Sequence, residues 1–164
     1  MEWPVNPTQE EAQVFLARRT NGHAWELLDQ ARRTEDDEAL MLAAAYASLY
    51  HWRLVGTAAN WQRGEWLIAR VYAALGRAGD SRRHAEACRE LTRAHPAAME
   101  DFDLAFGHEA MARALVLAGE TEQAREELRL AEAAGRAISD PEDRQVFFDC
   151  LTWGDWRGLK PAPA

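Results

Sequence analysis

The sequence has few of the features that mark secreted or membrane-embedded proteins. Its two cysteines, Cys88 and Cys150, are too few for a disulfide framework, and free buried cysteine is a common small apolar residue. The N-terminal residues have neither the basic region nor the apolar core of a secretory signal. The longest apolar run, Ala39–Tyr50, is too short to span a bilayer, which takes about 20 residues. We therefore expect a cytoplasmic protein without a membrane segment.

Positive charge is also scarce. The 164 residues include 19 Lys and Arg against 27 Asp and Glu, which gives a formal net charge of −8. Nucleic-acid backbones and anionic membrane surfaces both attract basic faces, so we expect neither as a partner. Hydrophobic residues make up 48% of the chain and charged residues 28%, as in ordinary globular proteins. A chain of this length fits one domain with its own core.

Strand patterns are missing as well, because no segment alternates polar and apolar residues over a useful length. Apolar residues recur instead at helical spacing, so the predicted fold class is all-α. Capping residues divide the chain into about eight helices. The predicted helices cover residues 8–20, 23–32, 34–55, 58–77, 81–94, 101–118 and 121–138, and an eighth begins at Pro141. We assign residues 1–7 to an extended arm, 8–157 to a single helical domain and 158–164 to a flexible tail.

One turn sequence occurs twice. Residues 118–121 read Ala-Gly-Glu-Thr, where Gly119 can end one helix and Thr121 can cap the next. Forty residues earlier, residues 78–81 read Ala-Gly-Asp-Ser, with Gly79 in the matching place. A turn that recurs at such a period indicates an array of helical hairpins.

The helices around these turns resemble the tetratricopeptide repeat, in which small and large residues alternate along a helical pair. The matching residues are Met111, Ala112, Leu115, Gly119, Ala124, Leu128 and Ala131 in one copy, and Tyr72, Leu75, Gly79, His84, Cys88, Leu91 and Pro96 in the other. The resemblance covers about residues 65–136. At the positions of the small residues Ala112 and Ala124, the copy nearer the N-terminus has Tyr72 and His84. Either these two side chains hydrogen-bond to each other, or the alignment of this copy with the repeat is shifted. The resemblance implies a stacked array that binds a protein or peptide and needs no cofactor.

In that family the first helix of each pair lines a concave groove. By position, the groove of this chain is lined by Trp66, Arg70, Arg77, Phe106, Glu109 and Arg113. Arginine binds carboxylates through two parallel hydrogen bonds, and tryptophan supplies an apolar anchor, so the groove suits an extended peptide or an acidic tail. The alternative is that Arg70 and Arg113 pair with neighbouring acids of the same chain.

A second hypothesis concerns polar residues on helix faces that are otherwise apolar: His51, Glu65, His84 and His108. Together they suggest a metal site or an acid–base enzyme. No local metal-binding motif joins them, and buried histidines are more often paired with a nearby carboxylate or hydroxyl. A homodimer is a further alternative, because seven tryptophans leave room for an apolar self-association face.

Overall fold

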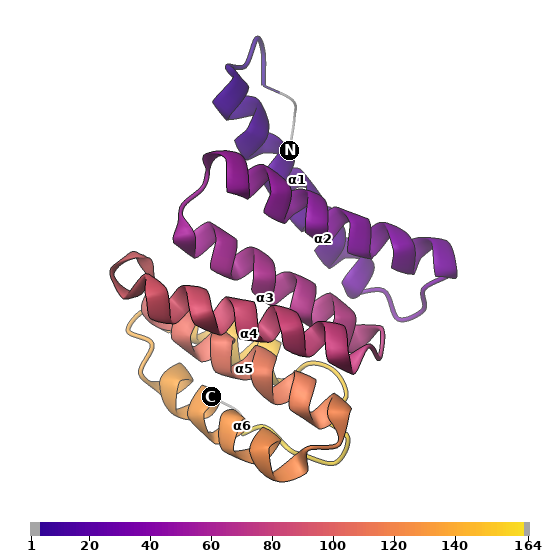
Figure 1. Cartoon of the computed structure of the whole chain (residues 1–164), viewed down its shortest axis with the longest axis vertical. Coiled ribbons are helices and arrows are strands. Elements are labelled where there is room, and N and C mark those ends of the chain that lie inside the picture. The colour runs from indigo at the N-terminus through magenta and orange to yellow at the C-terminus, as the bar shows by residue number, and fades with distance from the viewer. Residues whose placement is uncertain (1–3, 163–164) are drawn as a thin grey trace.

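The computed structural model describes residues 4–162, which contain seven α-helices packed in adjacent pairs, and α1 to α6 stack in chain order (Figure 1). The α-helices are α1 (Gln9–Leu28), α2 (Glu35–Val55), α3 (Ala58–Ala74), α4 (Ala78–Ala94), α5 (Asp101–Ala118), α6 (Thr121–Arg136) and α7 (Pro141–Thr152), and the 3-10 helix η1 (Pro96–Ala98) lies between α4 and α5. Residues 4–162 contain no strand. The all-α prediction is therefore confirmed.

The helix starts follow from the local sequence. Thr8 accepts a hydrogen bond from the backbone of Glu11, whose side chain in turn accepts one from the backbone of Thr8. Thr34 and Asp37 form the same capping box at the start of α2. Asp140 caps α7 directly before a proline, as predicted. These contacts satisfy amides at the helix starts that have no partner within the helix.

The number of helices is corrected from eight to seven, because α1 runs without a break through Asn21 and Gly22. A glycine within a helix costs about 1 kcal/mol relative to alanine, which tertiary packing can outweigh. Ala17 precedes the predicted break and Ala24 follows it, and both are fully buried. Ser48 of α2 also donates a hydrogen bond to the carbonyl of Ala17. Packing against α2 therefore holds both halves in one helix.

The predicted turn at Gly79 is also corrected. Gly119 ends α5 in the left-handed conformation, with φ of 79°, as expected. At the end of α3 the corresponding glycine is Gly76, with φ of 72°, whereas Gly79 lies inside the first turn of α4. After each of the two left-handed glycines the next amide donates to the carbonyl five residues back at 2.9 Å, which is the Schellman motif. Helices α3 and α5 thus end alike, although not at the forty-residue period, and a repeat is not confirmed.

The position of Gly76 changes which residues of α3 and α4 correspond to Ala112 and Ala124. Ala69 and Ser81 are both buried, and the Ser81 hydroxyl donates to the Ala69 carbonyl at 2.9 Å. These two occupy the small-residue positions that had been assigned to Tyr72 and His84. The rings of Tyr72 and His84 instead stack, with centroids 5.6 Å apart. Counted from Gly76, Ala69 and Ser81 therefore lie where Ala112 and Ala124 lie relative to Gly119, three residues before Tyr72 and His84.

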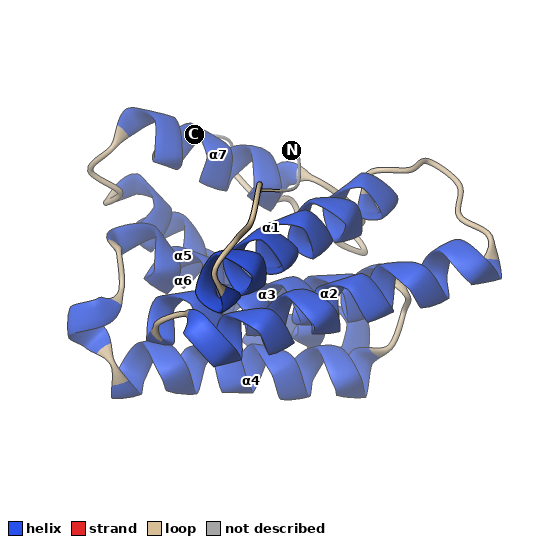
Figure 2. Cartoon of the chain, turned by 90° about the horizontal axis from the view of Figure 1, so that it is seen from above, coloured by secondary structure: helices blue, strands red, loops and turns tan. Residues whose placement is uncertain are grey.

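Helix α7 leaves the stacked order and folds back onto α5 and α6. Figure 2 shows α1 and α7 on one side of the molecule and α4 on the opposite side. Phe147 and Leu151 of α7 are fully buried, and Trp156 is 4% exposed just beyond the helix. Because α7 and α1 lie on the same side, they form two walls above α3 and α5. This arrangement creates the candidate site.

The structure describes most of the predicted arm and tail. Residues 4–7 contain no helix, and residues 1–3 of the predicted arm lie outside the described residues. In the predicted tail, Leu159 packs against the core and the amide of Ala162 donates to Glu132 at 2.8 Å. Residues 163–164 again lie outside the described part. None of the helices in residues 4–162 has the length and hydropathy that a membrane span requires.

Candidate functional site

Three buried charges form an ionic network between α3 and α5. Arg70, Glu109 and Arg113 are 2%, 0% and 8% exposed. Arg70 Nη1 donates to Glu109 Oε1 at 2.8 Å, and Arg113 Nε donates to the same oxygen from the next turn of α5. Trp66 Nε1 donates to the other oxygen, Oε2, at 2.8 Å. The carboxylate of Glu109 is therefore held by three donors on two helices.

The same arginines bind the C-terminal end of α7. Arg70 Nη2 donates to the Cys150 carbonyl at 3.1 Å. Arg113 Nη2 lies 2.9 Å from the Cys150 carbonyl, 3.2 Å from that of Leu151 and 2.7 Å from that of Trp153. The last carbonyls of a helix lack partners within the helix and carry partial negative charge. The two arginines thus cap α7 and attach it to α3 and α5.

The network keeps a net positive charge. Burial by itself raises the pKa of Glu109, but the charges of Arg113 and Arg70 outweigh it, so this pKa lies below its ordinary value. Burial lowers the pKa of Arg70, yet an arginine pKa starts so high that the group stays protonated at neutral pH. Two guanidinium groups therefore face one carboxylate inside the protein.

Tryptophan rings surround the two guanidinium groups. The distances from Arg70 Cζ to the ring centroids are 5.5 Å for Trp25, 5.5 Å for Trp66 and 4.8 Å for Trp153. Arg113 lies 4.3 Å from the centroid of Trp156. Aromatic faces attract cations, most strongly where water is excluded, so these rings offset part of the cost of burial.

The aromatic cavity is a space of about 460 Å³ with its floor on α3 and α5 and its walls on α1 and α7. The residues that matter for its chemistry are Trp25, Gln62, Trp66, Phe102, Phe106 and Val146. The rings of Trp66 and Phe106 lie 4.6 Å apart, and those of Trp25 and Trp66 lie 5.6 Å apart. The rings thus form a connected apolar surface.

The buried amide of Gln62 lies at the aromatic cavity. Its Nε2 donates to Thr92 Oγ1 at 3.1 Å and to the Asp103 carbonyl at 2.9 Å. Because the carbonyl can only accept, the orientation of the amide is fixed. The opposite atom, Oε1, is buried and has no hydrogen-bond partner among the described residues. Beside it, Arg63 and Asp103 form a two-point ion pair at 2.8 and 2.9 Å.

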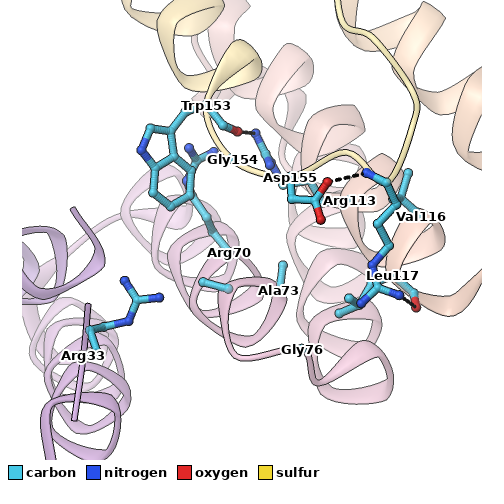
Figure 3. A pocket seen from close by; sticks show the side chains of 12 residues that line it. Arg33, Arg70, Ala73, Gly76, Arg113, Val116, Leu117, Trp153, Gly154 and Asp155 are labelled. Carbon is cyan, nitrogen blue, oxygen red and sulfur yellow. Dashed lines mark hydrogen bonds between the residues drawn. The ribbon is translucent and has the colours of Figure 1, made fainter. Parts of the chain in front are cut away.

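The arginine cavity is a separate space of about 290 Å³, shown in Figure 3. Its charged and aromatic residues are Arg33, Arg70, Arg113, Trp153, Asp155 and Arg157. The chain segment after α7 forms one side, where the Arg157 amide donates to Asp155 Oδ1 at 2.7 Å. Arg70 and Arg113 therefore connect the ionic network to this cavity.

The structure brings together most of the predicted groove residues. Trp66, Arg70, Glu109 and Arg113 form the ionic network, and Phe106 packs on Trp66. Arg77 lies elsewhere, in an ion pair with Asp80 at 2.7 Å and over the ring of Tyr72. The alternative in which the arginines pair with an acid of the same chain therefore describes Arg70 and Arg113, whose partner is Glu109.

Sequence reasoning did not find the residues that α1 and the C-terminal segment contribute. These residues are Trp25, Arg33, Trp153, Asp155 and Arg157. They lie far from α3 and α5 in the sequence, and no motif connects them. A basic residue next to an aromatic one is too common in this chain to have identified them.

The four residues proposed as a metal or acid–base cluster lie in three separate contacts. Only Glu65 and His84 bind each other, with 2.7 Å between Oε2 and Nδ1. The remaining contacts are His51 with Gln13 and His108 with Glu127. Within residues 4–162, no three His, Cys, Asp or Glu side chains are arranged to hold a metal ion.

A tyrosine extends the contact between Glu65 and His84. Tyr46 Oη lies 2.8 Å from His84 Nε2 and 3.2 Å from Tyr72 Oη. Partial burial of the phenol, together with the contact to Tyr72, raises the pKa of Tyr46 to about 12, although the residue is still 37% exposed. Between pH 10 and about pH 12, the phenol of Tyr46 is therefore mostly neutral in the folded protein, whereas in the unfolded chain it is mostly ionised.

This difference predicts a loss of stability in alkali. Because the unfolded state ionises at the ordinary pKa of 10.0, the free energy of unfolding should fall as pH rises from 10 towards 12. Urea unfolding at a series of pH values measures this fall in the free energy of unfolding. In Tyr46→Phe the fall should be smaller, because the phenol of Tyr46 is absent. Tyr50→Phe is the matched control, because Tyr50 is 61% exposed. Equal pH profiles for the two variants would contradict the assignment.

Comparisons of the chain with protein-family models, with curated proteins and with solved structures gave no match. The class of protein is therefore defined by the fold and the site themselves. Residues 4–162 form an all-helical protein of seven α-helices packed in adjacent pairs, in which a buried ionic network joins the last helix to α3 and α5.

Proposed function

We propose that the protein is a non-enzymatic binding module of tetratricopeptide-like fold, which takes an apolar side chain of a protein or peptide partner into the aromatic cavity. The observation that supports this proposal is the meeting of aromatic rings from α1, α3 and α5 around one space of about 460 Å³. The first helix of each pair contributes to it, as in a groove on the inner face of a helical array.

Aromatic rings that are already fixed in position favour the binding of an apolar group. Aromatic side chains provide much of the binding energy at protein interfaces, because they bury a large area and lose little conformational freedom. Trp66 is fixed by its hydrogen bond to Glu109, and Phe106 packs between Trp66 and Phe147. A partner would therefore meet a surface that is already ordered.

The polar groups of the cavity indicate a partner that carries a donor. Gln62 Oε1 is an acceptor without a partner among the described residues, and a buried acceptor gains from a hydrogen bond. An amide or indole N–H next to an apolar side chain would supply one, and a peptide carries such groups. Arg63 and Asp103 at the same cavity already satisfy each other. Recognition thus depends on an apolar anchor with one donor.

Arg70 and Arg113 have an indirect role in this proposal. Their guanidinium groups bind Glu109 and the carbonyls at the end of α7, so they are not open forks for a partner's carboxylate. Cys150, whose carbonyl they hold, lines the aromatic cavity. The two arginines therefore position the α7 wall.

A charge placed at the wall of the aromatic cavity tests the proposal. Val146 is 55% exposed and lines the cavity, so Val146→Arg should leave the fold intact and block entry. Leu104→Arg is the matched control, because Leu104 is 50% exposed but does not line the cavity. Peptides selected from a random library on the wild-type protein would then be titrated against all three proteins.

We expect selected peptides to share a large apolar residue and to bind Val146→Arg roughly tenfold or more weakly, which corresponds to about 1.4 kcal/mol. Binding to Leu104→Arg should stay within about twofold. Peptides that bind all three proteins equally, or a library that yields no binder, would contradict the proposal.

The homodimer remains a prediction. Among the tryptophans of residues 4–162, Trp153 is the most exposed, at 38%. Sedimentation of the purified protein over a range of concentrations measures the oligomeric state directly.

A further inference from the structure

We propose that the arginine cavity is a binding site for a small oxyanion, such as a phosphate ester or a dicarboxylate. This site is distinct from the aromatic cavity and does not depend on its function. The proposal rests on the charge inside the cavity, on the arginine side chains that line it, and on its size.

Positive charge gathers in the arginine cavity although the whole chain is acidic. Four arginines line it, whereas Asp155 is the one carboxylate among the described lining residues and Glu109 binds Arg70 from behind. Asp29, exposed at the end of α1, acts on Arg70 from outside. Even with Asp29 included, the arginines outnumber the acids by four to three. In a chain with a formal net charge of −8, such a local excess is unusual and attracts anions.

Arg33 brings charge to the cavity without a carboxylate partner. Its Nη1 donates to the carbonyls of Leu28 and Gln30, at 2.9 and 3.1 Å, at the end of α1. No ion pair of Arg33 occurs among residues 4–162, and its buried Nε has no hydrogen-bond partner there. The guanidinium is thus held in position by neutral carbonyls. Its full charge remains available to a ligand.

Arg70 and Arg157 also bring positive charge to the arginine cavity. Arg70 is 2% exposed, and its Nε has no hydrogen-bond partner among the described residues although its two terminal nitrogens are engaged. Arg157 contacts only the Leu117 carbonyl through its side chain, at 3.5 Å. Arg70 therefore contributes positive charge to the cavity, whereas Arg157 is exposed and can turn its planar guanidinium towards an oxyanion.

The loop after α7 shapes the cavity around Arg113. Gly154 has φ of 86°, and a Cβ atom there would lie 3.3 Å from Arg113 Nη1. The absence of a side chain lets the loop pass close to the guanidinium without covering it. The volume of about 290 Å³ equals the liquid volume of roughly ten water molecules. The space is thus large enough for a phosphate ester or a short dicarboxylate, and too small for a folded partner.

Calorimetric titration with inorganic phosphate, glycerol phosphate and succinate tests the site, with sodium chloride at matched ionic strength as the reference. Arg70 and Arg113 hold the fold, so the variants are Arg33→Gln, Arg157→Gln and their combination. The matched control is Arg125→Gln combined with Arg129→Gln, which removes the same charge from exposed ion pairs on α6. Circular dichroism and urea unfolding of each variant verify that it is folded.

We expect saturable binding of at least one probe by the wild-type protein, a loss of about tenfold in affinity for each single variant, and a larger loss for the combination. The control should stay within about twofold. Absence of saturable binding by every probe would overturn the proposal. Equal losses in the control would show general charge attraction and would overturn it too. Arg157→Gln, on the exposed loop, keeps the test decisive if Arg33→Gln unfolds.

Discussion

Replacing Glu109 by glutamine should lower the free energy of unfolding by about 3–5 kcal/mol, because it leaves two buried guanidinium groups without their carboxylate. Glutamine has nearly the same shape, so the loss would not come from an empty space. The NH2 of the glutamine can only donate, so it cannot accept the hydrogen bonds that Arg70 or Arg113 donate to the carboxylate. Since a domain of this kind is stable by only about 5–15 kcal/mol, the change would be large. Urea unfolding followed by circular dichroism measures it.

The matched control is Glu122→Gln, which removes the same charge from an ion pair in water. The Glu122 side chain is 82% exposed and lies 3.3 Å from Arg125. Exposed pairs contribute little, so this change should stay within about 0.5 kcal/mol. If both substitutions had equally small effects, the network would not stabilise the protein.

A triple variant separates charge from helix capping. Arg70→Met, Glu109→Leu and Arg113→Met together remove every charge of the network, and apolar replacements of a buried ion pair are often neutral. They also remove the donors that bind the carbonyls at the end of α7. We therefore expect the triple variant to be more stable than Glu109→Gln, but with weaker attachment of α7. Hydrogen exchange of α7 amides would show that weakening.

The second large effect is expected at Gly135, where α6 meets α7. A Cβ atom at this position would lie 2.6 Å from Cδ1 of Phe147 and 3.2 Å from Cζ of Phe148. Both rings are buried and pack on each other with centroids 5.2 Å apart, so neither can move freely. Overfilling a packed core costs about 1–3 kcal/mol. Gly135→Ala should therefore destabilise the protein and displace α7 from α6.

Gly22→Ala is the matched control for that substitution. Gly22 also lies inside a helix, but nothing lies within 4 Å of a Cβ atom placed there. Alanine is favoured over glycine in a helix by about 1 kcal/mol, so this change should stabilise the protein. Replacing glycine by alanine should thus lower the free energy of unfolding at Gly135 and raise it at Gly22. Changes of the same sign in urea unfolding would contradict the packing described at Gly135.

A destabilised α7 would also affect the two cavities. Val146 on α7 lines the aromatic cavity, and the segment directly after α7 lines the arginine cavity. Both sites therefore depend on the contacts of one short helix. Binding measurements on Gly135→Ala would show whether peptide and anion affinity decrease together.

The predictions from sequence succeeded where the signal was local. Caps at Thr8, Thr34 and Asp140, and the glycine end at Gly119, depend on hydrogen bonds between residues at most five apart. Trp66, Arg70, Glu109 and Arg113 do come together, because they follow helical spacing on two helices, and their role in binding stays a prediction. Their burial beneath the end of α7 was not foreseen.

The sequence alone determined that the chain is helical and where most helices begin, since helical spacing and capping are properties of neighbouring residues. The tertiary structure decided that α1 continues through Gly22, that Gly76 and not Gly79 ends α3, and that α7 folds back onto α5 and α6. These outcomes depend on which apolar faces pack together and on the free energy of burying them. Periodicity shows that a face exists but does not specify its partner, so the cavities arise only when distant helices meet.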